Sequence, residues 1–356
     1  MGTLTGNLSS PVRASELARH LREQINAGRF EPGERLPTFS QIHRNYGAAT
    51  NTVDRAYSLL ETDGLIERRP GSGVYVAEHA GMITTGTIGC LGAGFKGIDP
   101  YWAHCMRGIN QTLESRDTHP LLLPPDPKEA AWDKIDGLLC QGTARVPAGC
   151  PAELPRVSLL RCMPGAVSVV TDDYGGARAA TKHLLDIGHR RIATLFIQDD
   201  ELGVARLGGY EAALRLRGIQ PSPGWSRNCT GDFNSCDFAH VAETIMCRWL
   251  RNGWKELHFT ALLAQNDHVA IGAMNALNEA GVRVPDDVSV VGFDGTRVAE
   301  HCRPRLTTMK VPLERIGHRA ACELIRQIED GTRTDEETIQ LPVALLERDS
   351  TAPPAG

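Results

Sequence analysis

The sequence has no long apolar run. A membrane-spanning helix needs about 18 consecutive apolar residues, and no such run occurs among the 356 residues. The first residues also show no apolar segment of the kind that directs export. We therefore expect a protein that neither spans a membrane nor is secreted, and that works in the cytoplasm.

The sequence also lacks paired cysteines. Its 10 cysteines are scattered singly, with no Cys-x-x-Cys pair. Zinc sites and disulfide frameworks use closely spaced or regularly repeated cysteines, so neither is indicated. We expect the cysteines to be reduced and to act as small buried hydrophobic residues, and we expect no metal and no cofactor.

An excess of positive charge is absent as well. The formal net charge is −5, and the first 80 residues contain nine arginines, no lysine and nine acidic residues. The net charge therefore does not itself indicate binding to nucleic acid. Any binding to DNA has to depend on where individual arginines lie.

A stretch near the N-terminus carries the strongest local pattern. Thr38 is followed three residues later by Gln41, which predicts a capping box at the start of a short helix that ends at Gly47. We expect Thr50 to cap a second helix, which ends at Gly64. Four apolar residues of this second helix recur at helical spacing and predict a buried stripe: Val53, Ala56, Tyr57 and Leu60.

The polar residues of this second helix then face outward, where a DNA major groove could receive them. They are Asn51, Thr52, Asp54, Arg55 and Ser58. Two strand-like runs follow, Leu65–Ile66 and Val74–Val76, joined by a glycine-containing turn with Arg68 and Arg69. This pattern predicts a β-hairpin wing that approaches a phosphate. The alternative, a small helical domain whose polar face meets only water, is disfavoured by the two-arginine hairpin.

The same stretch resembles the GntR-type regulators over roughly residues 10 to 78. The matching segments are Pro32–Thr38, Asn51–Val53 with Arg55–Tyr57, Asp63–Ile66 and Arg69–Val76. The resemblance implies a winged helix-turn-helix that binds DNA through Thr38, Ser40, Arg44, Thr50, Asn51, Thr52, Arg55, Arg68, Arg69, Gly71 and Gly73. Ser40 and Ala49–Thr50 stand where the family often has arginines. Because arginine is the usual reader of guanine, the operator sequence is left open.

From Thr87 onward, strand-like and helical patterns alternate. This alternation predicts an α/β fold with parallel sheets covered by helices. The strand-like runs are Ile88–Leu91, Leu121–Leu123, Gly137–Leu139, Val157–Leu160, Ile192–Ile197, Leu262–Ala264 and Ser289–Phe293. The clear helices are Gly176–Ile187, Val204–Arg217, His268–Ala280 and Leu313–Ile328. We predict a DNA-binding domain at 1–77, a linker at 78–86, a ligand-binding domain at 87–350 and a disordered tail at 351–356.

Residues 87–350 resemble the ligand-binding part of LacI-type repressors, a two-lobed fold shared with periplasmic binding proteins. The matching segments are Asp172–Ala177, His183–Leu184, Gly188–His189, Arg206 with Gly209–Tyr210 and Ala213–Leu214, Asn266–Asp267 with Ala270–Ala273, Val284–Asp294 and Leu306–Thr308. A GntR-type head on a LacI-type body is the arrangement of the arabinose-responsive repressor branch. The resemblance and the side-chain chemistry indicate ligand contacts from Tyr101, Trp102, Arg206, Phe233, Asn266 and Asp294, which suit a sugar, polyol or nucleobase.

Structural alternatives remain for several of these residues. Asp294 and Arg206 could bridge the two lobes as an ion pair, and the Tyr101–Trp102 pair could belong to the core. Asp267 could cap the helix that follows it. The isolated histidines His183 and His189 are interpreted as structural.

Two departures from the LacI pattern limit the prediction of ligand class. Arg161 follows a strand after which many members place an aspartate, so one hydroxyl-binding carboxylate is missing. The segment from Pro124 to Ile135 is short, which predicts a truncated helix.

These patterns together predict a regulator of transcription. We expect a homodimeric repressor that leaves a palindromic operator when a small molecule such as a sugar binds. The alternative is a corepressor-type or activating regulator that responds to a nucleobase or another metabolite. An enzyme of the aminotransferase-fused kind is disfavoured, because the six lysines show no Schiff-base context.

Overall fold

The computed structural model describes most of the chain and divides it into two compact units. The described residues are 13–26, 29–62, 65–77, 85–92, 100–116, 118–124, 132–142, 145–197, 201–229, 238–254, 258–331 and 336–355. The first unit comprises residues 1–168 and 317–337, and the second comprises residues 169–316 and 338–356.

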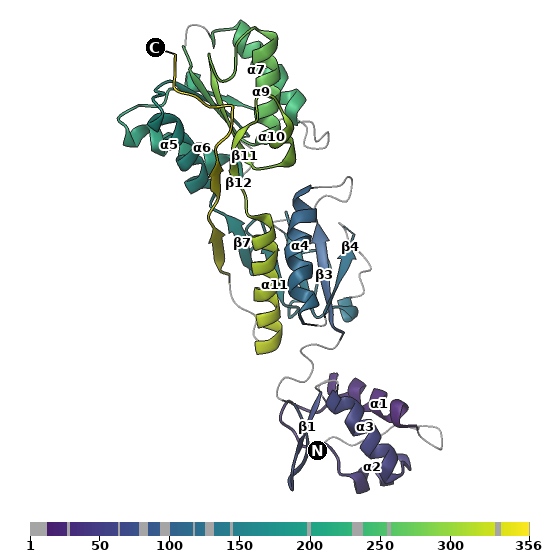
Figure 1. The fold of residues 1–356 in the computed structure, drawn as a ribbon. Coiled ribbons are helices and arrows are strands. Elements are labelled where there is room, and N and C mark those ends of the chain that lie inside the picture. Colours follow the sequence, from purple (N-terminus) through teal and green to yellow (C-terminus); the bar gives the residue numbers. More distant parts are fainter. Residues whose placement is uncertain are drawn as a thin grey trace. The chain divides into compact units, whose positions relative to one another are not determined.

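The N-terminal part of the first unit is three helices followed by a two-stranded hairpin (Figure 1). Its elements are α1 (Ala14–Asn26), α2 (Phe39–Tyr46), α3 (Thr50–Thr62), β1 (Ile66–Arg69) and β2 (Gly73–Val76). The predicted capping box is present, since Thr38 accepts from the Gln41 N–H and donates its own N–H to the Gln41 side chain. Gly47 ends α2 with φ of 66°, as predicted. Thr50 is not the cap of α3 but its first residue, and the Ala49 carbonyl accepts from Val53.

A single apolar cluster holds these three helices and the hairpin together. The predicted stripe of α3 is fully buried, and it packs against Leu17 and Leu21 of α1 and Ile42 of α2. The Tyr57 hydroxyl donates to the Pro37 carbonyl, and burial raises the pKa of Tyr57 above its ordinary value. This cluster gives the helix-turn-helix a core of its own.

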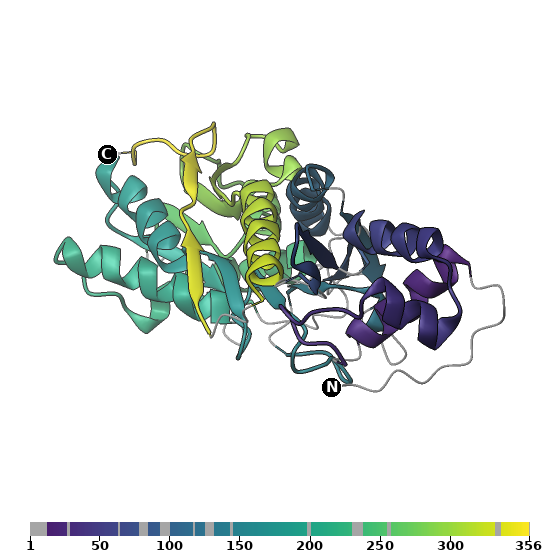
Figure 2. The same ribbon diagram turned by 90° about the horizontal axis from the view of Figure 1, so that it is seen from below.

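The first α/β sheet has six strands in the order β13-β7-β6-β5-β3-β4. The strands are β3 (Thr87–Gly92), β4 (His119–Leu123), β5 (Gly137–Gln141), β6 (Arg156–Leu159), β7 (Val167–Thr171) and β13 (Thr338–Leu341). The pairs among β3, β4, β5 and β6 are parallel, as predicted. The helices α4 (Pro100–Glu114) and α11 (Leu313–Asp330) lie side by side (Figures 1 and 2), where Gly317 meets the Cys105 backbone. The predicted shortening between Pro124 and Ile135 falls mostly outside the described residues.

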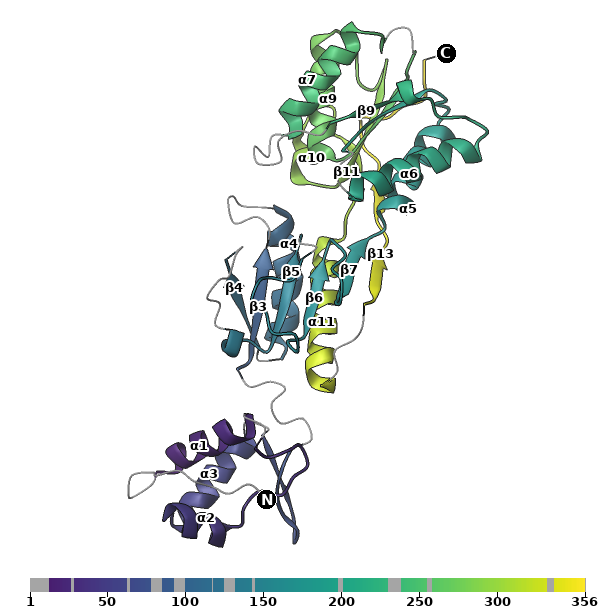
Figure 3. The same cartoon turned by 180° about the vertical axis from the view of Figure 1, so that it is seen from behind.

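The second α/β sheet also has six strands, in the order β14-β12-β11-β10-β8-β9. The strands are β8 (Ile192–Phe196), β9 (Ser226–Asn228), β10 (Ala261–Ala264), β11 (Ser289–Asp294), β12 (Thr307–Lys310) and β14 (Ala344–Leu346). Only β14, at one edge, pairs antiparallel. Figure 3 shows helices on both faces of this sheet. One face carries α5 (Asp173–Asp186) and α6 (Glu201–Leu216), and the other carries α7 (Phe238–Arg251), α9 (Asp267–Glu279) and α10 (Arg297–His301).

The C-terminal segment corrects one prediction. The prediction of a disordered tail at 351–356 is wrong for Ala352, whose N–H donates to Ser289 Oγ at 3.0 Å. The Ala352 carbonyl accepts from the buried His189 ring, whose Nδ1 lies 2.8 Å from Thr260 Oγ1. The segment is therefore tied to the second sheet, and the structural interpretation of His189 agrees with these contacts.

The burial of His189 makes stability depend on pH. Desolvation lowers the pKa of this imidazole below its ordinary value of 6.5, so the unfolded chain binds a proton more readily than the folded one. The stability from the neutral ring is present above about pH 6.5 and is lost progressively as the pH falls below it. Urea unfolding measures how much the free energy of unfolding falls between about pH 7.5 and about pH 5.5. This fall should be smaller in His189→Gln than in the unmutated protein. Equal losses would contradict this origin.

Candidate DNA-binding surface and ligand site

The outward face of α3 presents the predicted polar residues. Asn51 and Arg55 are exposed and Thr52 is half-buried, while Val53 and Ala56 on the opposite side of the helix are fully buried. Four other predicted DNA contacts are exposed as well: Thr38 before α2, Ser40 and Arg44 on α2, and Thr50 at the start of α3. The first turns of α3 therefore offer an amide, hydroxyl groups and a guanidinium to a partner.

Arg68, which is predicted to bind DNA from the base of the hairpin, contacts α3. Its Nη1 donates to Asp54 Oδ1 at 2.6 Å, its Nη2 donates to Ser58 Oγ at 2.9 Å, and its Nε lies 2.9 Å from Glu61 Oε2. All three partners belong to α3. Arg68 therefore fixes the hairpin against α3, and its charge is balanced by two carboxylates.

Arg69 and Arg35 supply the exposed positive charge of the hairpin. The Arg69 guanidinium lies over the Tyr75 ring, 4.6 Å from its centroid, and its only carboxylate partner among the described residues is Glu67, at 3.5 Å. Arg35 lies against Gly73, where a Cβ atom would come within 2.6 Å of the Arg35 side chain. Gly73 has φ of 136° and the exposed Gly71 has φ of 73°, so both favour glycine. The sequence reasoning missed Arg35, although it lies in the matching Pro32–Thr38 segment.

A second candidate site lies inside the second unit, around Arg206. Arg206 is 9% exposed, and its Nε donates to Asp173 Oδ1 at 2.7 Å. Its Nη2 lies 3.6 Å from Asp294 Oδ1, and its Cζ lies 3.7 Å above the centroid of the Phe293 ring. One buried guanidinium thus faces two buried carboxylates. Both members of the Arg206–Asp294 pair belong to the same unit, so the alternative that they bridge the two lobes is wrong.

The backbone presents Asp294 in an uncommon conformation. Asp294 ends β11 with φ of 112°, a value that a non-glycine residue adopts only at a cost. Its carbonyl accepts from Val311 of the neighbouring chain segment, which holds the strained residue in place. Strain of this kind gathers at functional sites because the surrounding structure is used to aim a side chain.

The end of β10 brings Asn266 close to Arg206. The neighbouring Gln265 carbonyl accepts a hydrogen bond from Arg206, and the Asn266 side chain caps α9 by accepting from the Val269 N–H at 2.9 Å. Asp267 is not the cap of α9. Its carboxylate accepts from the Thr296 N–H and hydroxyl, both at 2.7 Å, and from Thr308, while burial raises its pKa.

None of the three aromatic residues predicted to contact a ligand belongs to the described residues of the second unit. Tyr101 and Trp102 lie in α4 of the first unit and are half-buried. The Trp102 ring packs over Gly92, since a Cβ atom there would lie 3.1 Å from it. Phe233 lies outside the described residues.

Two polar residues of the cluster were missed by the sequence reasoning. Asp173 accepts a hydrogen bond from Arg206 Nε, and its other oxygen accepts from Thr171 Oγ1 at 2.6 Å. Gln265 is 5% exposed, and its Oε1 has no hydrogen-bond partner among the described residues. Asp173 stood in the matching Asp172–Ala177 segment, but nothing in that segment pairs it with a residue 33 positions later.

Two family models match separate parts of the chain. Residues 13–76 match the model of bacterial regulatory proteins of the gntR family, and residues 181–351 match a periplasmic binding protein-like domain. The chain joins a GntR-type helix-turn-helix domain to a periplasmic-binding-protein-like domain. The predicted fold class, with parallel α/β sheets after an N-terminal helix-turn-helix, is therefore confirmed.

Similar proteins share this combination or its second part. The arabinose metabolism transcriptional repressor of Geobacillus stearothermophilus is 28% identical over 94% of this chain and 96% of its own. The regulator CelR of Thermobifida fusca is 34% identical over half of each chain. Among solved structures, the CelR–cellobiose complex covers 88% of this chain and all of its own at 25% identity, with a TM-score of 0.64. A LacI family regulator from Enterococcus faecium with bound ribose covers 75% of this chain and 99% of its own at 27% identity, with a TM-score of 0.62.

This chain is therefore a ligand-responsive, DNA-binding regulator of transcription, with a GntR-type head and a periplasmic-binding-protein-like body. The similar proteins are named as regulators of transcription. Within the described part of the chain, no helix combines the length and apolarity needed to cross a membrane.

Proposed function

We propose that this chain is a cytoplasmic, homodimeric repressor that a sugar or closely related polyhydroxy compound releases from its operator. The observation that carries the proposal is the Arg206 cluster, in which a buried guanidinium is shared by Asp173 at 2.7 Å and Asp294 at 3.6 Å. The relatives named for arabinose metabolism and the complexes with cellobiose and ribose support a sugar as the ligand.

The charges of the cluster favour a neutral ligand rich in hydroxyl groups. One guanidinium and two carboxylates leave an excess of one negative charge within the cluster itself. Asp173 has both oxygens engaged, by Arg206 and by Thr171. We assign to Asp294, which ends β11 in an uncommon backbone conformation, the acceptance of a hydrogen bond from a sugar hydroxyl. Gln265 and Asn266 add amide groups at the end of β10.

The DNA-binding half of the proposal depends on two classes of side chain. Asn51 and Arg55 on α3 are assigned to base edges in the major groove, and Arg69 and Arg35 at the hairpin are assigned to phosphates. In a homodimer, two such heads read palindromic half-sites about one helical turn apart. Thr38, Ser40, Arg44, Thr50, Thr52, Gly71 and Gly73 are proposed as further contacts, with Arg68 as the residue that positions the hairpin.

Substitutions at Arg69 and Asn51 should separate the two classes of DNA contact. Arg69→Ala should weaken binding to all sequences alike and lower the slope of log affinity against log salt by about one, because one phosphate contact is lost. Asn51→Ala should instead reduce the preference for the operator over unrelated DNA. Salt titrations with both kinds of DNA measure the two effects. An Arg69→Ala slope equal to that of the unmutated protein would contradict the phosphate contact.

A thermal-shift screen tests the proposed effector directly. A compound that binds only the folded protein must raise its melting temperature. The screen includes pentoses, hexoses, disaccharides, sugar acids and polyols, with nucleosides and purines as the alternative class. A stabilising sugar should then lower the affinity of the protein for DNA upstream of its own gene, and by linkage the DNA should lower the affinity for the sugar by the same factor. Footprinting with no protection, with or without ligand, would refute the repressor function. DNA binding strengthened by the ligand would identify a corepressor-type regulator instead.

A further inference from the structure

A pocket of about 600 Å³ lies at the β9 edge of the second sheet, between β9 and α7. Neither Arg206 nor Asp294 is among the residues that line it. Its volume falls within the range of about 300 to 1,000 Å³ that is usual for small-molecule sites. It is therefore a place where a second kind of ligand can be considered.

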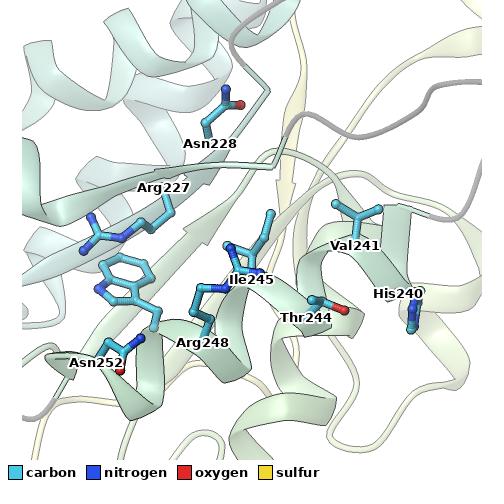
Figure 4. A pocket seen from close by; sticks show the side chains of 9 residues that line it. Arg227, Asn228, His240, Val241, Thr244, Ile245, Arg248 and Asn252 are labelled. Carbon is cyan, nitrogen blue, oxygen red and sulfur yellow. The ribbon is translucent and has the colours of Figure 1, made fainter.

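The lining residues of α7, together with Asn252 in the turn after it, form two neighbouring stripes. Thr244, Arg248 and Asn252 are spaced four residues apart, and so are Ile245 and Trp249. Residues at this spacing lie on one side of a helix. Figure 4 shows the labelled side chains of Thr244, Arg248 and Asn252 below the β9 residues Arg227 and Asn228. The pocket thus combines hydrogen-bond donors with an apolar wall.

The electrostatics of the pocket favour an anion. Two arginines line it and no acidic residue does. Arg227 lies over the Trp249 ring, 4.4 Å from its centroid, and donates to the carbonyls of Gly224 and Ser226. Arg248 is exposed, and within the described part of the chain no hydrogen bond or ion pair engages it. Exposed arginines elsewhere, such as Arg283 and Arg305, do have carboxylate partners.

Trp249 supplies an independent indication of a ligand. This tryptophan is 2% exposed, and its indole Nε1 has no hydrogen-bond partner among the described residues. Buried polar groups of native proteins nearly always have a partner. A buried donor without one, at the wall of a pocket that holds two guanidiniums, indicates an acceptor that comes from outside the chain.

The geometry points to a second effector site here, which binds a small oxyanion: a phosphate monoester or a polycarboxylate of metabolite size. The planar guanidinium of Arg248 suits the paired oxygens of either group. Thr244 and Asn252 donate to the same oxygens, and Ile245 packs against the carbon skeleton. The uncharged sugar proposed for the Arg206 cluster does not match this chemistry, so the two sites take different ligands.

Calorimetry on the full chain tests this site, with glycerol 3-phosphate, citrate and uncharged glycerol as probes. We expect saturable binding of at least one anion and none of glycerol, and the two anions distinguish the monoester from the polycarboxylate. Arg248→Ala should weaken the binding about ten- to a hundred-fold, the usual effect of losing a charged hydrogen bond. Arg251→Ala is the matched control, because Arg251 is exposed on the same helix but does not line the pocket.

Several results would overturn the anion site. No saturable heat with either anion would refute it, and so would an equal loss of affinity in Arg248→Ala and Arg251→Ala, which would indicate general surface charge. Binding should also change the tryptophan emission of the protein, and Trp249→Phe should remove that change. Asp294→Asn should leave anion binding intact. The test uses no DNA and no sugar, so its failure leaves the proposed repressor function untouched.

Discussion

Arg206→Ala will abolish the response to the sugar and lower the free energy of unfolding of the second unit by about 3–5 kcal/mol. The substitution removes the guanidinium that Asp173 and Asp294 share, and both carboxylates are buried. Removing one partner of a buried ion pair leaves the other charge buried and without compensation. The resulting loss of stability is larger than the stability that the intact pair contributes. Urea unfolding and calorimetry with the sugar found in the screen measure the two losses.

Arg215→Ala is the matched control for this prediction. Arg215 lies on the same helix, α6, and pairs with Glu211 one turn away at 2.7 Å, with about half of its side chain exposed. An exposed pair of this kind contributes only about 0.3–0.5 kcal/mol. Similar losses of stability in Arg206→Ala and Arg215→Ala would contradict the buried, shared guanidinium.

Asp294→Asn separates ligand binding from stability. Asparagine keeps the shape of the side chain and tolerates the positive φ of this position better than most residues. Arg206 keeps Asp173, so stability should change little. The affinity for the sugar should fall about ten- to a hundred-fold, because the accepting carboxylate becomes an amide. Unchanged affinity would remove Asp294 from the proposed site.

The ends and periods of the elements could be predicted from sequence because they depend on neighbours in the chain. The Thr38 capping box, the Gly47 end of α2 and the buried stripe of α3 each use residues at most one or two turns apart. Buried parallel strands such as β11 also stand out, since every one of its residues is buried and apolar side chains predominate.

The pairings within the sites could not be predicted, because they join distant segments. Arg68 meets α3 only after the hairpin folds back, and Asp173 meets Arg206 only when α5 packs on α6. The resemblance to LacI-type repressors predicted that Arg206 and Asp294 lie in one site. It did not predict that Asp173 also contacts the Arg206 guanidinium. The short strand β9 and its pocket had no signal either, since three residues are too few to show a period.

The packing of α5 on α6 leads to the second large effect, which a single methyl group should produce at Gly209. A Cβ atom at this position would lie 2.2 Å from the Tyr174 carbonyl oxygen and 3.0 Å from the Arg178 nitrogen, both backbone atoms of α5. Ordinary contact begins at 3.4 Å, so the two helices would have to separate by about 1 Å. Overpacking of this kind costs about 1–3 kcal/mol and occasionally more.

Gly208→Ala provides a control at the adjacent position of the same helix. A Cβ atom there would lie 3.6 Å from the Tyr174 ring, which is ordinary contact. Alanine favours a helix interior over glycine by about 0.5–1 kcal/mol, so Gly208→Ala should be neutral or stabilising while Gly209→Ala is destabilising. Thermal or urea unfolding measures the change in stability of each variant relative to the unmutated protein. The two changes should have opposite signs if close packing, and not helix propensity, decides the outcome.

Gly209→Ala should also weaken sugar binding, although Gly209 is not proposed to contact the ligand. Tyr174, which the added methyl group would displace, is the neighbour of Asp173, and Arg206 lies one turn before Gly209 on α6. Separating the two helices therefore lengthens the 2.7 Å contact that orients the Arg206 guanidinium toward Asp294. Binding sites lose function when the residues that support them let the binding side chains shift by about 1 Å. Calorimetry should show reduced affinity in Gly209→Ala and normal affinity in Gly208→Ala, and normal affinity in both would mean that the cluster does not depend on the approach of α6 to α5.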